Sequence, residues 1–163
     1  MKTFHLFLFT AIYLIFGFCN LINAQDSKIE NERHVEIKIN NQVYVCDTLS
    51  GFIQNKKYFD NPIEYINRCH FNVAAIEPYD FIFNTIFSED RKKELNGTGL
   101  IIRLCCDSQG NVIEISFLTF NISKYTIKEI NALESSFLKC KFKISNSCPE
   151  QKYYFFSLSH VWR

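Results

Sequence analysis

The sequence predicts an α+β fold in which a mainly antiparallel sheet is packed by one or two helices. Three observations lead to this prediction: strand-like alternation of apolar and polar residues, one helix with both a start signal and an apolar stripe, and short turns between neighbouring strands. The chain has 163 residues, of which 47% are hydrophobic and 21% charged, with 5 glycines and 3 prolines. This composition excludes collagen-like, low-complexity and disordered proteins.

The first 24 residues have the pattern of a signal peptide. Lys2 provides the positive start, residues 6–18 form an apolar run, and Ala24 is a small residue before the cleavage point. The run is shorter than the ~20 residues that a membrane-spanning helix needs. We therefore expect an exported periplasmic or extracellular protein whose residues 25–163 form a single domain without a membrane span. An uncleaved anchor and a lipid attached to Cys19 are the alternatives.

The charge balance of the mature chain carries no argument for nucleic acid binding. Lys2 is the only charged residue of the leading segment, so the remaining chain has equal numbers of basic and acidic residues. Ile, Asn, Lys and Phe are abundant whereas Ala and Gly are scarce, which favours a bacterium with an AT-rich genome. In a eukaryotic secreted protein, the alternative, Asn96 and Asn121 would be glycosylation acceptors.

Residues 34–46 predict a β-hairpin. Apolar residues alternate with polar ones as in a half-buried strand, and the apolar ones are Val35, Ile37 and Ile39. Asn40-Asn41 supplies the turn because asparagine tolerates positive φ, and residues 42–46 form the returning strand. Residues 48–72 are less informative, with a turn or helix start at Pro62 and one or two helical turns over 63–66.

Residues 78–95 predict one longer helix. Pro78 suits its first turn, the basic residues 91–93 complement the dipole at its end, and Asn96-Gly97 terminates it. The spacing of the apolar residues predicts a buried stripe made of Phe81, Ile82, Thr85 and Ile86.

The clearest pattern begins at Gly99. An apolar strand over 100–106, a turn over 107–111 and a second strand over 112–120 predict another hairpin, in which Gly110 supplies positive φ. Thr126 and Glu129 form a capping box that starts a helix. Its apolar face consists of Ile127, Ile130, Leu133, Phe137 and Cys140. Strands follow over 141–144 and 153–162, and one side of the latter carries Tyr154, Phe156, Leu158 and Trp162.

This order of strand, Asp-x-x-Gly-Asn turn, strand, capped helix and strand resembles the C-terminal domain of TonB. More closely, it resembles small uncharacterised exported proteins of Bacteroides-like bacteria. The resemblance covers about residues 99–156, and the motifs that carry it lie at 101–104, 107–112, 115–117 and 126–142. TonB itself has an uncleaved anchor and a proline-rich spacer, which this chain lacks, so energy transduction is not implied. The resemblance implies a fold and, as a binding mode, an extended peptide added to a sheet edge.

A Bacteroides-like origin also gives Asp47-Thr48-Leu49 a meaning. The tripeptide resembles the short O-glycosylation sequence used in those bacteria, and Thr48 would be the modified residue. A chance occurrence of the three residues is the alternative.

Six cysteines follow the leading segment, and an even number in an exported domain predicts disulfides. Neighbouring residues of a strand point to opposite faces, so Cys105 and Cys106 serve different partners. Cys140 is a suitable partner for whichever of the two faces the helix. The alternative is a set of buried free thiols that behave as small apolar residues. The six are Cys46, Cys69, Cys105, Cys106, Cys140 and Cys148.

The sequence contains no Cys-x-x-Cys, zinc-ligand pair, nucleophile elbow, P-loop or dinucleotide fingerprint. We therefore expect no cofactor, no metal and no catalytic residues. The histidines of the mature chain are His34, His70 and His160, and none has a catalytic partner at a recognisable spacing. His160 falls on the apolar side of the last strand, where it is either a core histidine or a ligand-binding one.

The candidate binding residues are the aromatic Tyr153 and Phe155, together with His160. An exposed aromatic face or a sheet edge in this strand would suit a peptide, a glycan or a partner protein, whereas a sheet covered on both sides would not. We expect a non-catalytic binding module of the bacterial envelope whose partner is an envelope protein, peptide or glycan. A thiol-dependent enzyme with Cys105 or Cys69 as nucleophile and a structural envelope component are the alternatives.

Overall fold

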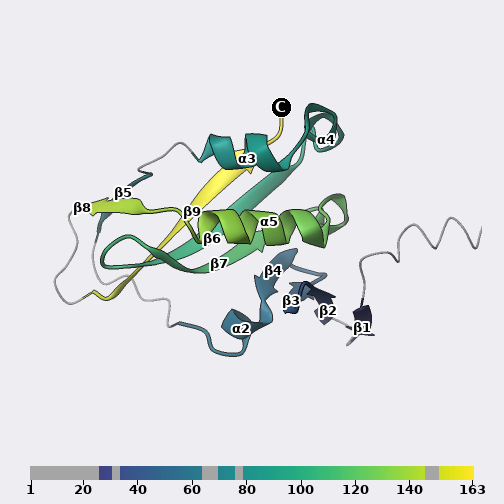
Figure 1. Cartoon of the computed structure of the whole chain (residues 1–163), viewed down its shortest axis with the longest axis horizontal. Coiled ribbons are helices and arrows are strands. Elements are labelled where there is room, and N and C mark those ends of the chain that lie inside the picture. Colours follow the sequence, from purple (N-terminus) through teal and green to yellow (C-terminus); the bar gives the residue numbers. More distant parts are fainter. Residues whose placement is uncertain (1–25, 31–33, 64–69, 76–78, 146–150) are drawn as a thin grey trace, which may run out of the picture.

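The structure, a computed structural model, describes residues 26–30, 34–63, 70–75, 79–145 and 151–163. Its centre is a seven-stranded sheet in which every neighbouring pair of strands is antiparallel. The α+β class with a mainly antiparallel sheet is thus confirmed. In their order across the sheet (Figure 1), the strands are β1 (Asp26–Glu30), β2 (His34–Ile39), β3 (Gln42–Asp47), β4 (Phe52–Asn55), β7 (Val112–Leu118), β6 (Gly99–Asp107) and β9 (Tyr153–Val161).

The helices are short and gather mainly on one face of this sheet. Figure 1 shows α3 and α5 in front of β9, β6 and β7, while β5 and β8 pair with each other in a separate two-stranded sheet. The helical segments are α2 (Lys56–Phe59), α3 (Asp80–Ile86), α4 (Glu89–Glu94), the 3-10 turn η1 (Ile122–Lys124) and α5 (Ile127–Phe137), and the small sheet consists of β5 (Asn72–Ala75) and β8 (Phe142–Ser145).

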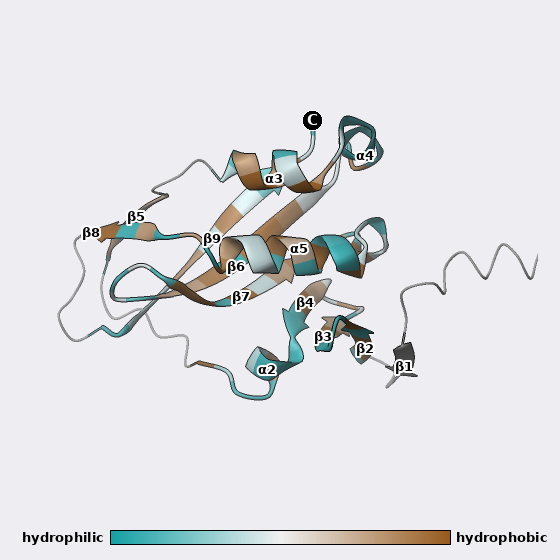
Figure 2. Cartoon of the chain, in the orientation of Figure 1, coloured by the Kyte–Doolittle hydropathy of each residue, from teal (hydrophilic) through white to brown (hydrophobic). Residues whose placement is uncertain are grey.

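The core lies between the sheet and α5. Ile130, Leu133 and Phe137 of α5 are buried against apolar side chains of the central strands, such as Leu104 and Phe117. Burying each of these side chains contributes about 1.5–3 kcal/mol. Figure 2 shows the consequence in the colouring, with a mainly brown, hydrophobic β6 beneath the helices and a mainly teal, hydrophilic α4.

Both predicted hairpins are present. Asn40 and Asn41 have φ of 48° and 63°, as a two-residue turn that follows the twist of β2 and β3 requires. At the β6–β7 turn, the Asp107 carboxylate accepts hydrogen bonds from the backbone N–H groups of Gln109 and Asn111, both at 2.9 Å. Gly110 adopts a φ of 83° there, which a side chain would disfavour.

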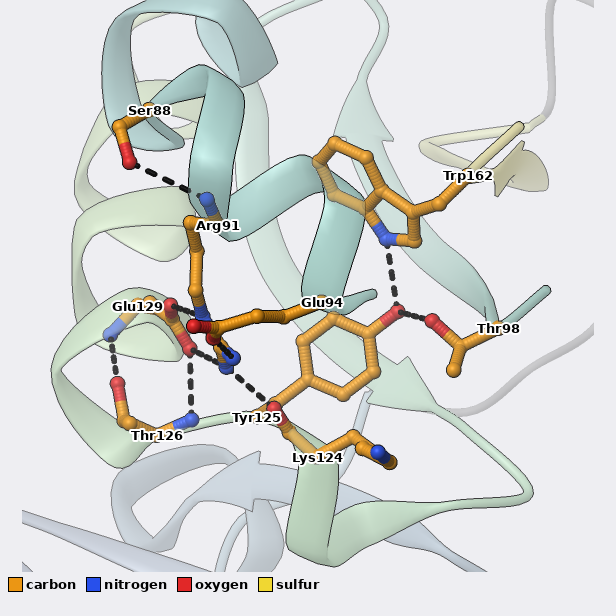
Figure 3. A network of polar contacts seen from close by, with 9 residues as sticks. All are labelled: Ser88, Arg91, Glu94, Thr98, Lys124, Tyr125, Thr126, Glu129 and Trp162. Atoms are coloured by element: carbon orange, nitrogen blue, oxygen red, sulfur yellow. Dashed lines mark hydrogen bonds and ion pairs between the residues drawn. The ribbon is translucent and has the colours of Figure 1, made fainter. Parts of the chain in front are cut away.

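The predicted capping box is also present and belongs to a larger polar cluster, which we call the Arg91 clamp (Figure 3). The Arg91 guanidinium donates to both Glu129 oxygens, at 2.6 and 3.1 Å, and to the Lys124 carbonyl. Glu129 in turn accepts from the Thr126 backbone N–H at 2.7 Å. The clamp joins α4 to the start of α5, two segments that are distant in the sequence.

The prediction of one helix over 78–95 is wrong. The structure has α3 and α4 with a break at Phe87, whose backbone is extended, and Ser88 caps α4 by accepting from the Arg91 backbone N–H at 3.3 Å. The break allows Phe83 and Phe87 to enter the core, whereas Phe81 of the predicted stripe is 72% exposed. Burial of two aromatic rings therefore overrides the local helical pattern.

Two further differences concern the elements around the sheet. β4 and α2 form within residues 48–72, for which we predicted no strand. The strand predicted over 141–144 exists as β8, but it pairs with β5 instead of joining the main sheet. The helical turns predicted over 63–66 extend into residues outside the described part. Among the described residues, no helix has the length and apolar character needed to cross a membrane.

Candidate functional site

The face of the sheet opposite α5 carries most of the polar side chains, and we call it the polar face. Its members follow from the register, in which one cross-strand row runs from Val45 through Gln54, Ser116 and Arg103 to Ser157. A parallel row contains Asp47, Phe52, Leu118, Ile101 and Ser159.

A hollow of about 370 Å³ lies on the polar face. The Arg103 guanidinium lies 6.0 Å from the centre of the Phe52 ring, and Nε2 of His34 lies 3.9 Å from a carboxylate oxygen of Asp47. A cation, an imidazole and a carboxylate among apolar walls are groups that orient a small polar ligand. The residues that define the hollow are His34, Val45, Asp47, Phe52, Phe59 and Arg103.

The Asp47 carboxylate is fixed by the turn that follows β3. Its Oδ1 accepts from the backbone N–H groups of Leu49 and Ser50, at 3.0 and 3.1 Å. Thr48 is exposed in the same turn, so a modifying enzyme would have access to its hydroxyl. O-glycosylation of Thr48 stays a prediction.

Cys105 lies on the polar face but is unsuited to nucleophilic chemistry. It is 1% exposed, and burial together with the nearby Glu114 carboxylate raises the pKa of its thiol far above the usual range. Burial likewise raises the pKa of Cys46 to about 11 and, with the nearby Asp107 and Cys140, that of Cys106 to about 12. All three would stay protonated at neutral pH.

The positions of the described cysteines do not test the predicted disulfides, which stay a prediction. Cys46, Cys105 and Cys106 are free thiols in this structure, whereas Cys69 and Cys148 lie outside the described residues. Cys106 is on the face toward α5, as the expected pairing with Cys140 requires, and both belong to the same apolar cluster. Among the described residues, no three histidine, cysteine or acidic side chains are grouped so that they could hold a metal ion.

The three predicted binding residues do not form one site. Tyr153 is 40% exposed and Phe155 is partly buried, and both lie on the polar face. His160 lies on the opposite face, where its ring stacks on Phe83 with 3.8 Å between centroids. Burial lowers the pKa of His160, opposed by the nearby Asp80. His160 is therefore a core histidine beneath α3.

The edge of the sheet at β9 is the second candidate feature. β9 pairs with β6 along its whole length, from Tyr153 opposite Asp107 to Val161 opposite Gly99, without a bulge. In the part of the chain that the structure describes, no strand pairs with its other side. The nine residues of β9 include no charged residue and no proline.

Sequence reasoning missed a buried polar network between α5 and the sheet. Glu134 is 1% exposed, and its carboxylate accepts from the Tyr44 hydroxyl and, at 3.3 Å, from the Asn55 amide. Asn131 donates to the Tyr44 oxygen at 2.9 Å. The signal was present, because Glu134 falls between Ile130 and Phe137 on the apolar side of α5.

A solved structure is similar to this chain in its fold. It is the crystal structure of a DUF5043 family protein from Bacteroides uniformis, with a TM-score of 0.62 and 19% sequence identity. The two chains share one fold. The match covers 86% of this chain and 92% of the other, and it agrees with the predicted resemblance to uncharacterised proteins of Bacteroides-like bacteria. The resemblance to the TonB C-terminal domain is not confirmed. No protein-family model matches the chain, and no curated protein matches it.

Proposed function

We propose that this protein is a non-catalytic binding module of the bacterial envelope that captures an extended peptide segment at the β9 edge. The observation that carries the proposal is the edge itself. The backbone N–H and C=O groups on the outer side of an edge strand can pair with a further strand, and folded proteins usually block such an edge with lysine, proline or a bulge. β9 has none of these devices over its nine residues.

Peptide addition would use the backbone for affinity and the side chains beside β9 for selection. Each new backbone hydrogen bond contributes about 0.5–1.5 kcal/mol. Ser157 and Ser159 are exposed and small, which leaves room for large peptide side chains at the middle of the strand. Tyr153 and Val161, 40% and 56% exposed, offer apolar cross-strand contacts at its two ends.

The polar face extends the recognition surface away from the edge. Arg103 is directly opposite Ser157 in the β6–β9 register. A peptide residue placed opposite Ser157 on the other side would lie about 10 Å from Arg103 across the two strand spacings. We therefore expect a preference for an acidic or hydrogen-bonding peptide side chain at that position.

A thiol-dependent enzyme is the rival function. Burial and the raised pKa of Cys105 argue against that residue as a nucleophile. Cys69 lies outside the described residues, and labelling of the native protein with a thiol reagent tests it. A cysteine that reacts rapidly at neutral pH and maps to Cys69 would favour the enzyme.

Selection from a displayed library of random peptides on the purified mature protein tests the proposal. Bound peptides should slow amide hydrogen exchange in β9, and the double substitution Ser157→Lys/Ser159→Lys should weaken binding by roughly tenfold or more. The matched control is Ser108→Lys/Ser135→Lys, which adds the same charge at two other exposed serines and should leave binding unchanged.

Three results would overturn the proposal. Peptide protection confined to another part of the chain, or equal binding by both double variants, would remove the β9 edge as the binding site. A concentration-dependent dimer in sedimentation velocity that only Ser157→Lys/Ser159→Lys abolishes would assign the edge to a second copy of the chain.

A further inference from the structure

A groove of about 300 Å³ lies on the helix side of the molecule, far from the polar face. One wall is α3, and the other is the end of α5 with the turn that leads into β8. Its apolar surface comes from Tyr79, Ile82 and Phe142, while Phe81 stands at the rim.

Two cations flank this apolar surface. Lys139 and Lys141 both line the groove and are exposed. Within the described part of the chain, neither ammonium group forms an ion pair, although Arg91, Lys92 and Lys93 of α4 all do. The groove thus combines an apolar wall with two lysines that have no acidic partner among the described residues.

We propose that this groove binds an alkyl carboxylate, with the chain against Ile82 and Phe142 and the carboxylate beside Lys139 and Lys141. At about 300 Å³, the groove is at the small end of the range for small-molecule pockets, which suits a short ligand such as an eight-carbon acid. The opposite charges select the acid over a neutral or cationic chain of the same length. This site is independent of the β9 edge, so either assignment can fail without the other.

Alkylation of Cys140 can report on binding in the groove. Cys140 lines it and is partly exposed, whereas Cys46, Cys105 and Cys106 are buried. In protein that has first been reduced and freed of the reductant, so that any disulfide of Cys140 is open, a chain bound in the groove would cover the Cys140 thiol and slow its alkylation by a neutral reagent such as iodoacetamide. Peptide mass mapping assigns the alkylated cysteine, so the other thiols of the chain do not confuse the measurement.

The test uses octanoate as the probe and octylammonium as the control of opposite charge. We expect octanoate to bind with a dissociation constant on the order of 1 mM, the range for a ligand of this size, and to slow Cys140 alkylation at saturation. Octylammonium should do neither. Binding should weaken as salt is raised, because the lysines are exposed.

Charge reversal locates the carboxylate. The double substitution Lys139→Glu/Lys141→Glu should weaken octanoate binding by roughly tenfold. The control Lys38→Glu/Lys128→Glu changes the net charge equally at two exposed lysines elsewhere. It should leave octanoate binding within about twofold. Circular dichroism and the melting temperature confirm that each variant is folded.

Three outcomes would overturn the proposal. They are equal binding of octanoate and octylammonium, equal weakening by both double reversals, and octanoate binding that leaves Cys140 alkylation unchanged. Binding of an acidic peptide without binding of octanoate would assign the groove to a protein partner instead.

Discussion

The replacement of Gly110 by alanine should destabilise the fold far more than its backbone conformation alone explains. A Cβ atom at Gly110 would lie 1.8 Å from the Phe142 carbonyl oxygen, a distance that no real contact allows. The Phe142 backbone would have to move away. That movement would break the hydrogen bond of 2.9 Å from the Phe142 N–H to the Gly110 carbonyl.

The magnitude has three parts. Alanine in the left-handed region costs about 1–2 kcal/mol. The lost hydrogen bond costs about 0.5–1.5 kcal/mol. Phe142 is 2% exposed, and loosening its side chain in the core costs up to about 3 kcal/mol more. Together these parts give a loss of about 1.5–6.5 kcal/mol in the free energy of unfolding for Gly110→Ala.

Gly97 provides a matched control. Its φ of 76° is close to the 83° of Gly110, but nothing lies within 4 Å of the Cβ that alanine would add. Gly97→Ala should therefore show only the conformational cost of about 1–2 kcal/mol. Urea unfolding of both variants, followed by circular dichroism, measures the difference. Equal losses for the two variants would refute the clash between Gly110 and Phe142.

Three other predictions follow from the polar groups of the core and the clamp. Burial opposes ionisation of Glu129, but hydrogen bonds from Arg91 outweigh this effect and lower the Glu129 pKa. The stability that this carboxylate contributes should therefore be present above pH 4.5 and be lost as the pH falls through the lowered pKa. In urea unfolding at several pH values, Glu129→Gln should flatten this dependence. Tyr44→Phe removes a hydrogen-bond donor to Glu134, and a thermal unfolding experiment should show a loss of about 1–3 kcal/mol, whereas an unchanged stability would contradict a role for this contact. Burial lowers the pKa of His160, so its contribution to the free energy of unfolding should be fully present above about pH 6.5 and decrease below it. His160→Gln should remove this decrease, and a decrease that persists in the variant would contradict the burial of the histidine.

The local signals in the sequence predicted local structure well. The Asn40-Asn41 turn, the Asp107 turn and the Thr126 capping box each depend on residues within a few positions of one another. Their geometry is therefore readable from a short segment.

Features that depend on distant partners were not predictable in the same way. Strand β4 lies in a stretch that gave no clear prediction. Its polar residues Gln54 and Asn55 bond to Glu114 and Glu134, which are distant in the sequence, so no local pattern marks the strand. The break at Phe87 likewise depends on the position of Trp162, because the Trp162 and Phe87 rings pack against each other with 4.7 Å between their centroids.

In the candidate sites, too, features set by neighbouring residues were predictable and features set by distant partners were not. Alternation along the last strand places Tyr153 and Phe155 on one face and His160 on the other, and counting positions alone would have separated them. The groove beside Lys139 and Lys141 could not be predicted, because it exists only where α3 packs beside the end of α5.

The pairing of β9 with β6 has a consequence for biosynthesis. β6 lies between β7 and β9 in the sheet, yet β9 is synthesised only after β7, α5 and β8. Until β9 emerges from the ribosome, Trp162 is missing from its position against Phe87, and its indole N–H cannot reach the Tyr125 hydroxyl 3.0 Å away. Such long-range pairing delays folding into the millisecond-to-second range. The sheet of a nascent chain therefore stays incomplete at β6 until the whole of β9 is available for pairing.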